Sequence, residues 1–436
     1  MSVSKIQNDS SQPFNKATEI SPKTGGSLEC KIVEGSSQVS NLTSEQQDHV
    51  LDIIQKSPTK AITFDPLSIK CLRNILVDEF CIFSLKELPD GSLADLCVSG
   101  TRTKIWNSKT GTLLHTFGRH FEQLSDGTFA AGSNKEKSIQ ILDPKTQTIV
   151  RILKGHKDTI TALEPLSKGI VASGSRDKTI KIWDHTSGTC LHTFKGHKKA
   201  VIGLKSLSDS TFASGCKKKI VKVWDLNEKT CLCTFKAHKR FFSNLKELSD
   251  GTFASYYGDN ITHWDLKTGT CLHTFQHYAV SKIEPLLNGL LASVYSARDA
   301  DDSGYRRTKI KIWDTKTRTC RHEFGNHTDT ISDLKNLSNG NFATASFDNT
   351  ISIWNPELGV CVSMLRTEES PNVLKEFSNG ILFSGHFNGA IQIWDYQKGA
   401  NLRTLREHKG GVVDIIQLID GTFASASYDS NINIWG

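Results

Sequence analysis

Short segments in which apolar and polar residues alternate follow one another along most of the chain, in a pattern that recurs about every 40 residues. Residues 156–195 contain four such segments, the last three at 170–174, 179–183 and 190–194. Successive side chains of a β-strand point to opposite faces, so this alternation predicts four short, half-buried strands in each repeat. Asp-Gly or Asn-Gly commonly separates the first two strands, as expected for tight hairpin turns. The pattern therefore predicts an all-β chain.

A tryptophan closes the third strand of nearly every repeat. The eight tryptophans are Trp106, Trp183, Trp224, Trp264, Trp313, Trp354, Trp394 and Trp435. A ninth copy at 138–143 has Leu142 in the tryptophan position. Nine repeats therefore fill the chain from about residue 80 to Gly436. A single four-stranded sheet cannot bury both of its faces, whereas stacked sheets closed into a ring can.

The repeats resemble the WD-repeat (WD40) family of β-propellers in their Gly-His pairs, in the aspartate before the third strand and in their Trp-Asp ends. One complete repeat carries Gly155, His156, Asp177, Trp183 and Asp184. The resemblance covers roughly four-fifths of the chain and implies a closed β-propeller of four-stranded blades. We predict nine blades, with eight as the alternative because propellers typically have four to eight.

The N-terminal part of the chain differs from the repeats. Residues 1–41 are polar and predicted to be disordered. Residues 42–79 are predicted to form a short, partly helical segment, and residues 80–436 the propeller. The family resemblance implies that an N-terminal strand completes the last blade, and residues 61–64 are the predicted closing strand because they resemble the ends of the repeats.

The same N-terminal segment also resembles an F-box, the helical motif that docks receptors onto the adaptor of cullin-type ubiquitin ligases. The resemblance rests on the apolar positions of residues 42–54 and on residues 67–73, with Thr43 in place of the usual proline. The alternative interpretation is an ordinary helix that packs on the ring.

A histidine, a serine or threonine, an aspartate and a tryptophan recur as a set in three repeats. The sets are His156, Ser173, Asp177 and Trp183; His327, Thr344, Asp348 and Trp354; and His408, Ser425, Asp429 and Trp435. These residue types suggest a hydrolase, but the sequence shows no sign of a nucleophile elbow. The family resemblance implies a structural hydrogen-bond chain instead. Lys218 and Asn388 replace the aspartate in two repeats, so we expect those blades to be less stable.

Two patterns suggest metal binding and do not satisfy its requirements. Cys-Leu-His pairs lie on separate repeats, whereas a closed zinc site needs four converging ligands. The insertion at 299–310 begins like a calcium loop, but Arg307 and Ile310 occupy ligand positions. We therefore predict no metal, no cofactor, no small-molecule substrate and no enzymatic activity.

The loops that lead into the repeats are basic, in a chain whose formal net charge is +7. By analogy with the family, these loops and those before the third strands open onto one rim, beside Phe241 and Phe242. The predicted partner-binding residues are Lys157, Arg176, Lys198, Lys199, Lys217, Lys239, Arg240 and Lys409. Such a rim suits an acidic or phosphorylated peptide or protein, or a phosphoinositide head group. The alternative is that these lysines only keep a large ring soluble.

These observations predict a non-catalytic scaffold that binds a protein partner. The alternatives are a substrate receptor of a cullin-type ubiquitin ligase and a phosphoinositide-binding module at a membrane surface. Nucleic acid is disfavoured because no aromatic stacking platform is evident. The odd number of cysteines, eleven, and the lack of an apolar secretory signal or membrane span predict a cytosolic protein. We expect a monomer.

Overall fold

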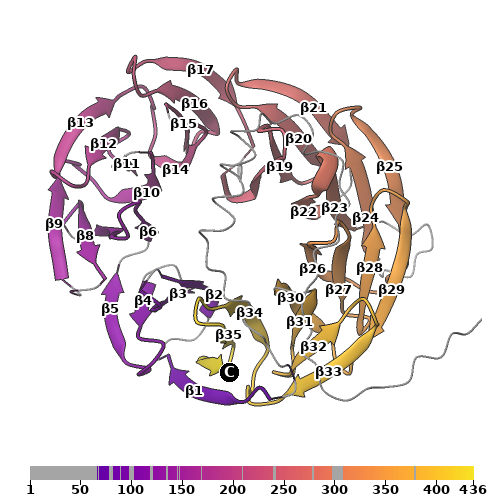
Figure 1. The fold of residues 1–436 in the computed structure, drawn as a ribbon. Coiled ribbons are helices and arrows are strands. Elements are labelled where there is room, and N and C mark those ends of the chain that lie inside the picture. The colour runs from indigo at the N-terminus through magenta and orange to yellow at the C-terminus, as the bar shows by residue number, and fades with distance from the viewer. Residues whose placement is uncertain are drawn as a thin grey trace, which may run out of the picture. The chain divides into compact units, whose positions relative to one another are not determined.

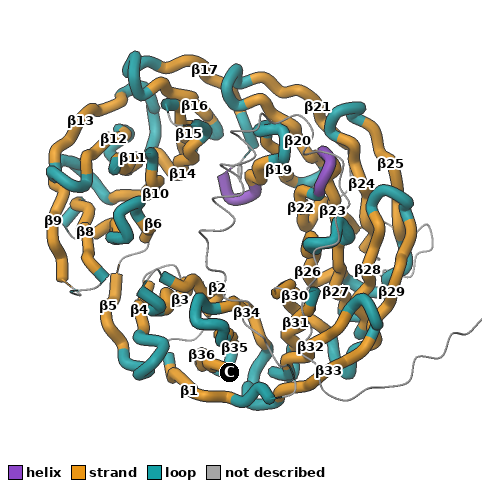
Figure 2. The backbone as a smooth tube through the Cα atoms, viewed as in Figure 1, coloured by secondary structure: helices purple, strands orange, loops and turns teal. Residues whose placement is uncertain are grey.

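The computed structural model divides the chain into two units, Met1–Ile62 and Thr63–Gly436. The structure describes residues 66, 68–77, 82–88, 90–97, 103–117, 121–133, 136–144, 146, 148–167, 169–208, 210–238, 242–276, 279–296, 308–377 and 380–436. All of them belong to the second unit. Their strands form nine four-stranded antiparallel sheets arranged in a ring (Figures 1 and 2), which confirms the predicted all-β propeller and its nine blades.

The blades are numbered in chain order. Blades 1 to 3 contain β2 (Ile82–Glu87), β3 (Leu93–Cys97), β4 (Thr103–Trp106) and β5 (Leu113–Phe117); β6 (Phe121–Gln123), β7 (Phe129–Ser133), β8 (Ser138–Asp143) and β9 (Thr148–Lys154); and β10 (Ile160–Pro165), β11 (Ile170–Ser175), β12 (Ile180–Asp184) and β13 (Thr189–Phe194). Blades 4 to 6 contain β14 (Val201–Ser206), β15 (Thr211–Cys216), β16 (Ile220–Asp225) and β17 (Cys231–Lys236); β18 (Leu245–Glu247), β19 (Phe253–Tyr257), β20 (Asn260–Asp265) and β21 (Thr270–Gln276); and β22 (Val280–Pro285), β23 (Leu290–Ser296), β24 (Thr308–Asp314) and β25 (Thr319–Phe324).

Blades 7 and 8 contain β26 (Ile331–Asn336), β27 (Phe342–Ser346), β28 (Thr350–Asn355) and β29 (Val360–Arg366); and β30 (Pro371–Phe377), β31 (Ile381–His386), β32 (Ile391–Asp395) and β33 (Ala400–Leu405). Blade 9 contains β34 (Val412–Gln417), β35 (Phe423–Ser427), β36 (Asn431–Trp435) and, as its outer strand, β1 (Cys71–Leu76). Two short 3₁₀ helices, η1 (Phe242–Asn244) and η2 (Leu287–Gly289), complete the described elements. In each blade the first strand lines the centre of the ring, and the outermost strand lies at the periphery (Figure 1).

An N-terminal strand closes the ring, but it is β1 and not the predicted segment 61–64, which lies outside the described residues. β1 pairs with β36 in antiparallel register, with Ile75 opposite Ile432. Ile75 is buried in a core cluster that also contains Leu85 of blade 1 and Ala424 of blade 9. Residues 71–76, which the sequence analysis assigned to the partly helical segment, therefore belong to the propeller.

The apolar cores lie between neighbouring blades. The aromatic residue that ends an outer strand packs against the tryptophan of the next blade, with ring-centroid distances of 4.9 Å for Phe194–Trp224, 4.8 Å for Phe275–Trp313 and 4.7 Å for Phe324–Trp354. The recurring tryptophan and terminal phenylalanine are thus two halves of one inter-blade contact. This contact explains why the repeat cannot be stable alone.

Carboxylates on the inner strands also join one blade to the next. Glu164 accepts a hydrogen bond from the amide of Ser206 at 2.9 Å, and Asp414 accepts one from the amide of Leu85 at 2.8 Å. The second bond crosses from blade 9 to blade 1 and therefore helps to close the ring.

Hydrogen bonds define two faces of the ring. On one face, the loop that leads into a blade contacts the turn between its second and third strands, as the amide of Arg176 donates to the carbonyl of Thr159 at 2.9 Å. We call this the entrance face. On the opposite face, the other two turns of each blade meet, as the amide of Leu226 donates to the carbonyl of Ser210 at 2.8 Å.

Candidate partner-binding surface

The recurring His-Ser-Asp-Trp set of blade 3 is a buried chain of hydrogen bonds. Nδ1 of His156 contacts the Asp177 carboxylate at 2.8 Å, and its Nε2 contacts Oγ of Ser173 at 2.8 Å. Nε1 of Trp183 donates to the same Oγ at 2.8 Å. The serine hydroxyl is therefore enclosed between two aromatic side chains, and the set ties the entrance loop to the strands of the blade.

Blades 7 and 9 contain the same arrangement. His327 contacts Asp348 at 2.9 Å and Thr344 at 2.7 Å, and Trp354 donates to Thr344 at 2.8 Å. His408 contacts Asp429 at 3.0 Å and Ser425 at 2.8 Å, and Trp435 donates to Ser425 at 2.8 Å. Each set satisfies the buried indole and imidazole nitrogens, which would otherwise destabilise the fold.

The electrostatics of these sets match a structural role. Burial lowers the pKa of His156 below its usual value, although Asp177 opposes that shift. Burial alone would raise the pKa of Asp177, but hydrogen bonds from Thr179, the Lys157 amide and His156 outweigh it and lower the pKa to about 2. At neutral pH a neutral imidazole therefore faces an ionised carboxylate.

The two repeats in which Lys218 and Asn388 replace the aspartate differ from each other. In blade 8, where Asn388 replaces it, the histidine comes from β31 instead of the entrance loop. His386 contacts Oγ of Ser384 through Nε2 at 2.8 Å and the carbonyl of Glu369 through Nδ1 at 2.8 Å. Both ring nitrogens thus have a hydrogen-bond partner, so the substitution of asparagine for aspartate leaves neither of them unsatisfied.

Blade 4 has no such compensation. His197 contacts Oγ of Ser214 through Nε2 at 2.7 Å, but no group in the described part of the chain contacts its buried Nδ1. Lys218 occupies the position of Asp177 and is exposed. Burial lowers the pKa of His197 to about 4, so the ring is neutral at physiological pH.

The structure brings five of the predicted partner-binding residues together on the entrance face of blades 3 and 4. Lys157, Arg176, Lys198, Lys199 and Lys217 are all exposed. Within blade 3 the amide of Arg176 bonds to the loop that carries Lys157. Within blade 4 the amide of Lys217 donates to the carbonyl of Ala200 at 3.1 Å, which places its turn against the loop of Lys198 and Lys199.

The other predicted residues do not join this group. Lys409 lies on the loop that leads into blade 9, on the same face but separated from blade 3 by blades 1 and 2 (Figure 1). Lys239 and Arg240 lie outside the described residues. Conversely, Lys195, Lys218 and Lys219 are exposed on the same blade 4 loops. All three belong to the loops that the sequence shows to be basic, although they are not among the predicted partner-binding residues.

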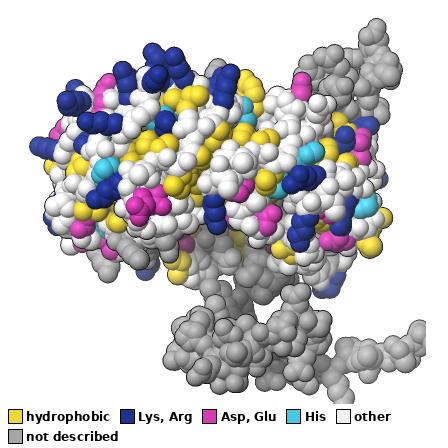
Figure 3. Space-filling model, turned by 90° about the horizontal axis from the view of Figure 1, so that it is seen from above, with side chains coloured by type: hydrophobic (Ala, Val, Ile, Leu, Met, Phe, Trp, Pro, Cys, Tyr) yellow, Lys and Arg dark blue, Asp and Glu magenta, His cyan; other side chains and the backbone are white. Residues whose placement is uncertain are grey.

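The described lysines on the entrance-face loops of blade 4 have no internal counter-ion. Among the described residues, none of Lys195, Lys198, Lys199 and Lys217–Lys219 forms an ion pair, whereas lysines elsewhere do, such as Lys246 with Glu284 at 3.1 Å and Lys311 with Glu323 at 3.5 Å. Figure 3 shows lysine and arginine side chains crowded along one rim of the ring. We call Lys157, Arg176, Lys195, Lys198, Lys199 and Lys217–Lys219 the basic patch.

Phe242 does not line this patch, contrary to the prediction. It lies in η1, and its ring packs so closely on blade 4 that a Cβ on Gly203 or Gly215 would approach it within 2.6 or 2.2 Å. The two glycines thus make room for the ring, which fills the space between blades 4 and 5. Phe241 lies outside the described residues.

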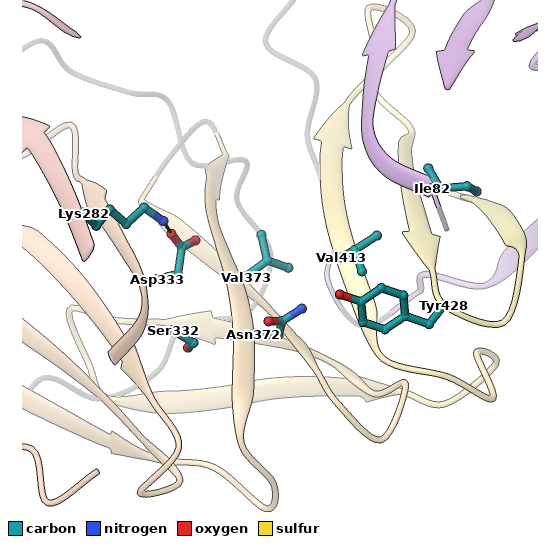
Figure 4. A pocket seen from close by; sticks show the side chains of 8 residues that line it. All are labelled: Ile82, Lys282, Ser332, Asp333, Asn372, Val373, Val413 and Tyr428. Atoms are coloured by element: carbon teal, nitrogen blue, oxygen red, sulfur yellow. Dashed lines mark hydrogen bonds and ion pairs between the residues drawn. The ribbon is translucent and has the colours of Figure 1, made fainter. Parts of the chain in front are cut away.

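A hollow of about 220 Å³ is lined by residues of blades 6 to 9 and by Ile82 of blade 1, and Figure 4 shows this lining. The charged side chains within it are already engaged. Nζ of Lys282 contacts the Asp333 carboxylate, whose other oxygen accepts the amide of Leu374 at 2.8 Å. The residues around the hollow therefore stabilise neighbouring blades, and the basic patch is the better candidate for binding a partner.

The described residues contain neither a candidate membrane span nor a candidate metal site. No helix there is long and apolar enough to span a membrane. No group of three or more histidine, cysteine, aspartate or glutamate side chains is arranged there to hold a metal ion.

Comparison with known proteins identifies the repeats. The family model described as "WD domain, G-beta repeat" matches residues 147–184, 188–225, 318–355 and 399–436. No curated protein matches significantly. A crystal structure of the computationally designed Ika8 protein is 22% identical, with a TM-score of 0.46 over 84% of this chain and 99% of that chain. Four segments of the chain therefore match the WD40 repeat, and the described strands form a nine-bladed β-propeller, an architecture that supports a protein-interaction scaffold in general.

Proposed function

We propose that the protein is a scaffold that captures an acidic or phosphorylated segment of a partner protein on the basic patch of blades 3 and 4. The observation that carries this proposal is the set of neighbouring exposed cations without internal counter-ions. Lysines that only confer solubility are normally mixed with acidic side chains. An unneutralised patch instead attracts negative charge and speeds its association.

The loops of the patch are well suited to hold such a partner. In blade 3, the Asp177 carboxylate binds the amide of Lys157 at 2.9 Å and that of Thr179 at 2.9 Å, which fixes the loop and the turn to each other. Side chains on a fixed backbone lose less conformational freedom when they bind a ligand. The rigid propeller thus presents flexible lysine side chains from a preorganised surface.

Charge reversal at Lys198, Lys199 and Lys217 tests the proposal. The probe is a fluorescent peptide that alternates glutamate and phosphoserine, and binding is measured by anisotropy at several salt concentrations. We expect Lys198→Glu, Lys199→Glu and Lys217→Glu together to weaken binding at least about 100-fold without lowering the melting temperature. The affinity of the unmodified protein should fall as salt rises, because these charges are exposed.

The matched control makes the same change of charge on the opposite face. Lys109, Lys229 and Lys267 are exposed on turns of blades 1, 4 and 5. Their replacement by glutamate should leave binding within about threefold, because charges beyond a Debye length of about 10 Å are largely screened. Equal loss in both triple variants would show that only net charge matters, and the proposed surface would be wrong.

The two alternative functions are phosphoinositide binding at a membrane surface and substrate recognition for a cullin-type ubiquitin ligase. The membrane alternative is tested with vesicles that contain phosphoinositide. Tighter binding of the protein to these vesicles than to the peptide would favour a membrane surface over a protein partner. The F-box resemblance gains nothing from the structure, because residues 71–73 form part of strand β1 and residues 42–54 lie outside the described residues. A cytosolic location stays a prediction from the sequence.

A further inference from the structure

The turn between the second and third strands of blade 4 keeps the backbone of a complete blade. Lys219 has φ of 63°, as Lys178 has 71° at the equivalent position of blade 3. The amide of Lys219 donates to the carbonyl of Cys216 at 2.9 Å, and that of Lys178 to the carbonyl of Ser175 at 3.2 Å. An aspartate at position 218 would therefore stand where Asp177 stands in blade 3.

The absence of that aspartate leaves a buried polar atom unsatisfied. His197 is only 7% exposed, and its Nδ1 has no partner among the described residues. In blade 3 the equivalent atom, Nδ1 of His156, contacts Asp177. A buried donor or acceptor without a partner destabilises the folded state. Blade 4 is thus less stable than an aspartate at this position would make it.

The lysine that replaces the aspartate also concentrates like charge. Lys217, Lys218 and Lys219 are consecutive and exposed, and their turn is bonded to the loop of Lys198 and Lys199. Like charges in contact destabilise a surface, so this substitution is unfavourable in two separate ways. Such local violations of the rules of stability concentrate at functional sites.

We propose that Lys218 is the specificity-determining residue of the basic patch, and that the Lys217–Lys219 turn with Lys198 and Lys199 anchors an anionic side chain of the partner. This inference rests on the proposed function and deepens it. The anion is a carboxylate or a phosphoryl group, because lysine ammonium groups act as point charges toward either. In blade 3 the negative charge at this turn comes from Asp177. In blade 4 an anion of the partner would supply it instead.

The test is Lys218→Asp in the full chain. Two fluorescent peptides serve as probes, one alternating glycine with phosphoserine and the other alternating glycine with glutamate. We expect the substitution to weaken binding of the preferred peptide at least about tenfold. It should also raise the melting temperature by about 1–3 °C, because the new carboxylate satisfies His197. A protected Nδ1–H proton of His197 in the NMR spectrum of the variant provides a direct readout of that bond.

Two control variants separate the causes. Lys218→Ala removes the charge without adding an acceptor, so binding should weaken while the melting temperature rises less than in Lys218→Asp. Lys229→Asp makes the same charge change on the opposite face of blade 4 and should alter neither quantity. Tighter binding of the phosphoserine peptide would identify a phosphoryl anchor, and tighter binding of the glutamate peptide would identify a carboxylate anchor. Equal affinity for both would contradict a specificity-determining role of Lys218.

Unchanged peptide affinity in Lys218→Asp would overturn the anchor, and so would a melting temperature that does not rise. The proposed function has its own criterion. If the triple reversal at Lys198, Lys199 and Lys217 abolishes binding while Lys218→Asp does not, the patch binds anions without this anchor. If neither affects binding, the patch itself is not the site.

Discussion

Replacement of Ile75 by aspartate is expected to open the ring and lower the melting temperature by about 10 °C or more. Ile75 is 1% exposed and packs where the last blade meets the first. Loss of a buried isoleucine side chain alone costs about 2–5 kcal/mol, and an unpaired buried carboxylate adds to that loss. Without β1, strand β36 presents an unpaired edge, which favours aggregation.

Calorimetry and hydrogen exchange measure this result. The amides of β36 that pair with β1 should exchange much faster in the variant, whereas those of blades 4 and 5 should change less because each blade contacts mainly its neighbours. The matched control is Leu76→Asp, one residue further along the same strand, since Leu76 is 65% exposed. If both variants melt at the same temperature, β1 does not close the ring in solution.

Removal of the three structural aspartates should give the second large loss of stability. Asp177, Asp348 and Asp429 each hold a buried histidine and the amide that follows it, for instance Thr328 at 2.9 Å from Asp348. Replacement of each by alanine should cost about 2 kcal/mol, because the histidine and the amide lose a charged acceptor. The three sites lie in different blades without shared partners, so the losses should add to about 6 kcal/mol in urea unfolding.

This loss should depend on pH in a defined direction. Burial opposes ionisation of Asp348, but hydrogen bonds from His327 and Thr350 lower its pKa to about 2. A carboxylate whose pKa is lower in the folded state stabilises the fold above its unfolded value of about 3.9. The difference between the unmodified and triple-alanine proteins should therefore be full at pH 7 and shrink between about pH 4 and pH 2. Glu407→Ala, which removes an exposed carboxylate beside His408, should have little effect at any pH.

Much of the blade structure follows from local sequence. The alternation of 179–183 predicts the strand observed as Ile180–Asp184, and the repeat count predicts nine blades. The recurring tryptophans mark the third strands because each indole must be buried against the preceding sheet, as Trp224 is against Phe194. These features repeat with the chain, so periodicity alone reveals them.

The sequence could not identify every contact that crosses between distant segments. Residues 61–64 resemble the ends of the repeats, whereas Cys71–Leu76 does not alternate apolar and polar residues in the sequence. Only pairing with β36 and packing between blades 9 and 1 select Cys71–Leu76. Phe242 follows basic residues in the sequence, yet its ring packs against blade 4 because Gly203 and Gly215 leave room for it. In blade 8, His386 on strand β31 takes the place of the histidine expected on the entrance loop, and the spacing of the motif does not predict this.

The sequence by itself determined the class of the protein: nine WD40-type blades, the tryptophan and phenylalanine positions, the aspartate-containing sets and the basic loops. Only the tertiary structure decided which strand closes the ring, which lysines lie together and that Nδ1 of His197 has no partner. The reason is physical. Strand alternation and tight turns depend on neighbours in the chain, whereas ring closure, burial and charge clustering depend on residues that only the complete ring brings together.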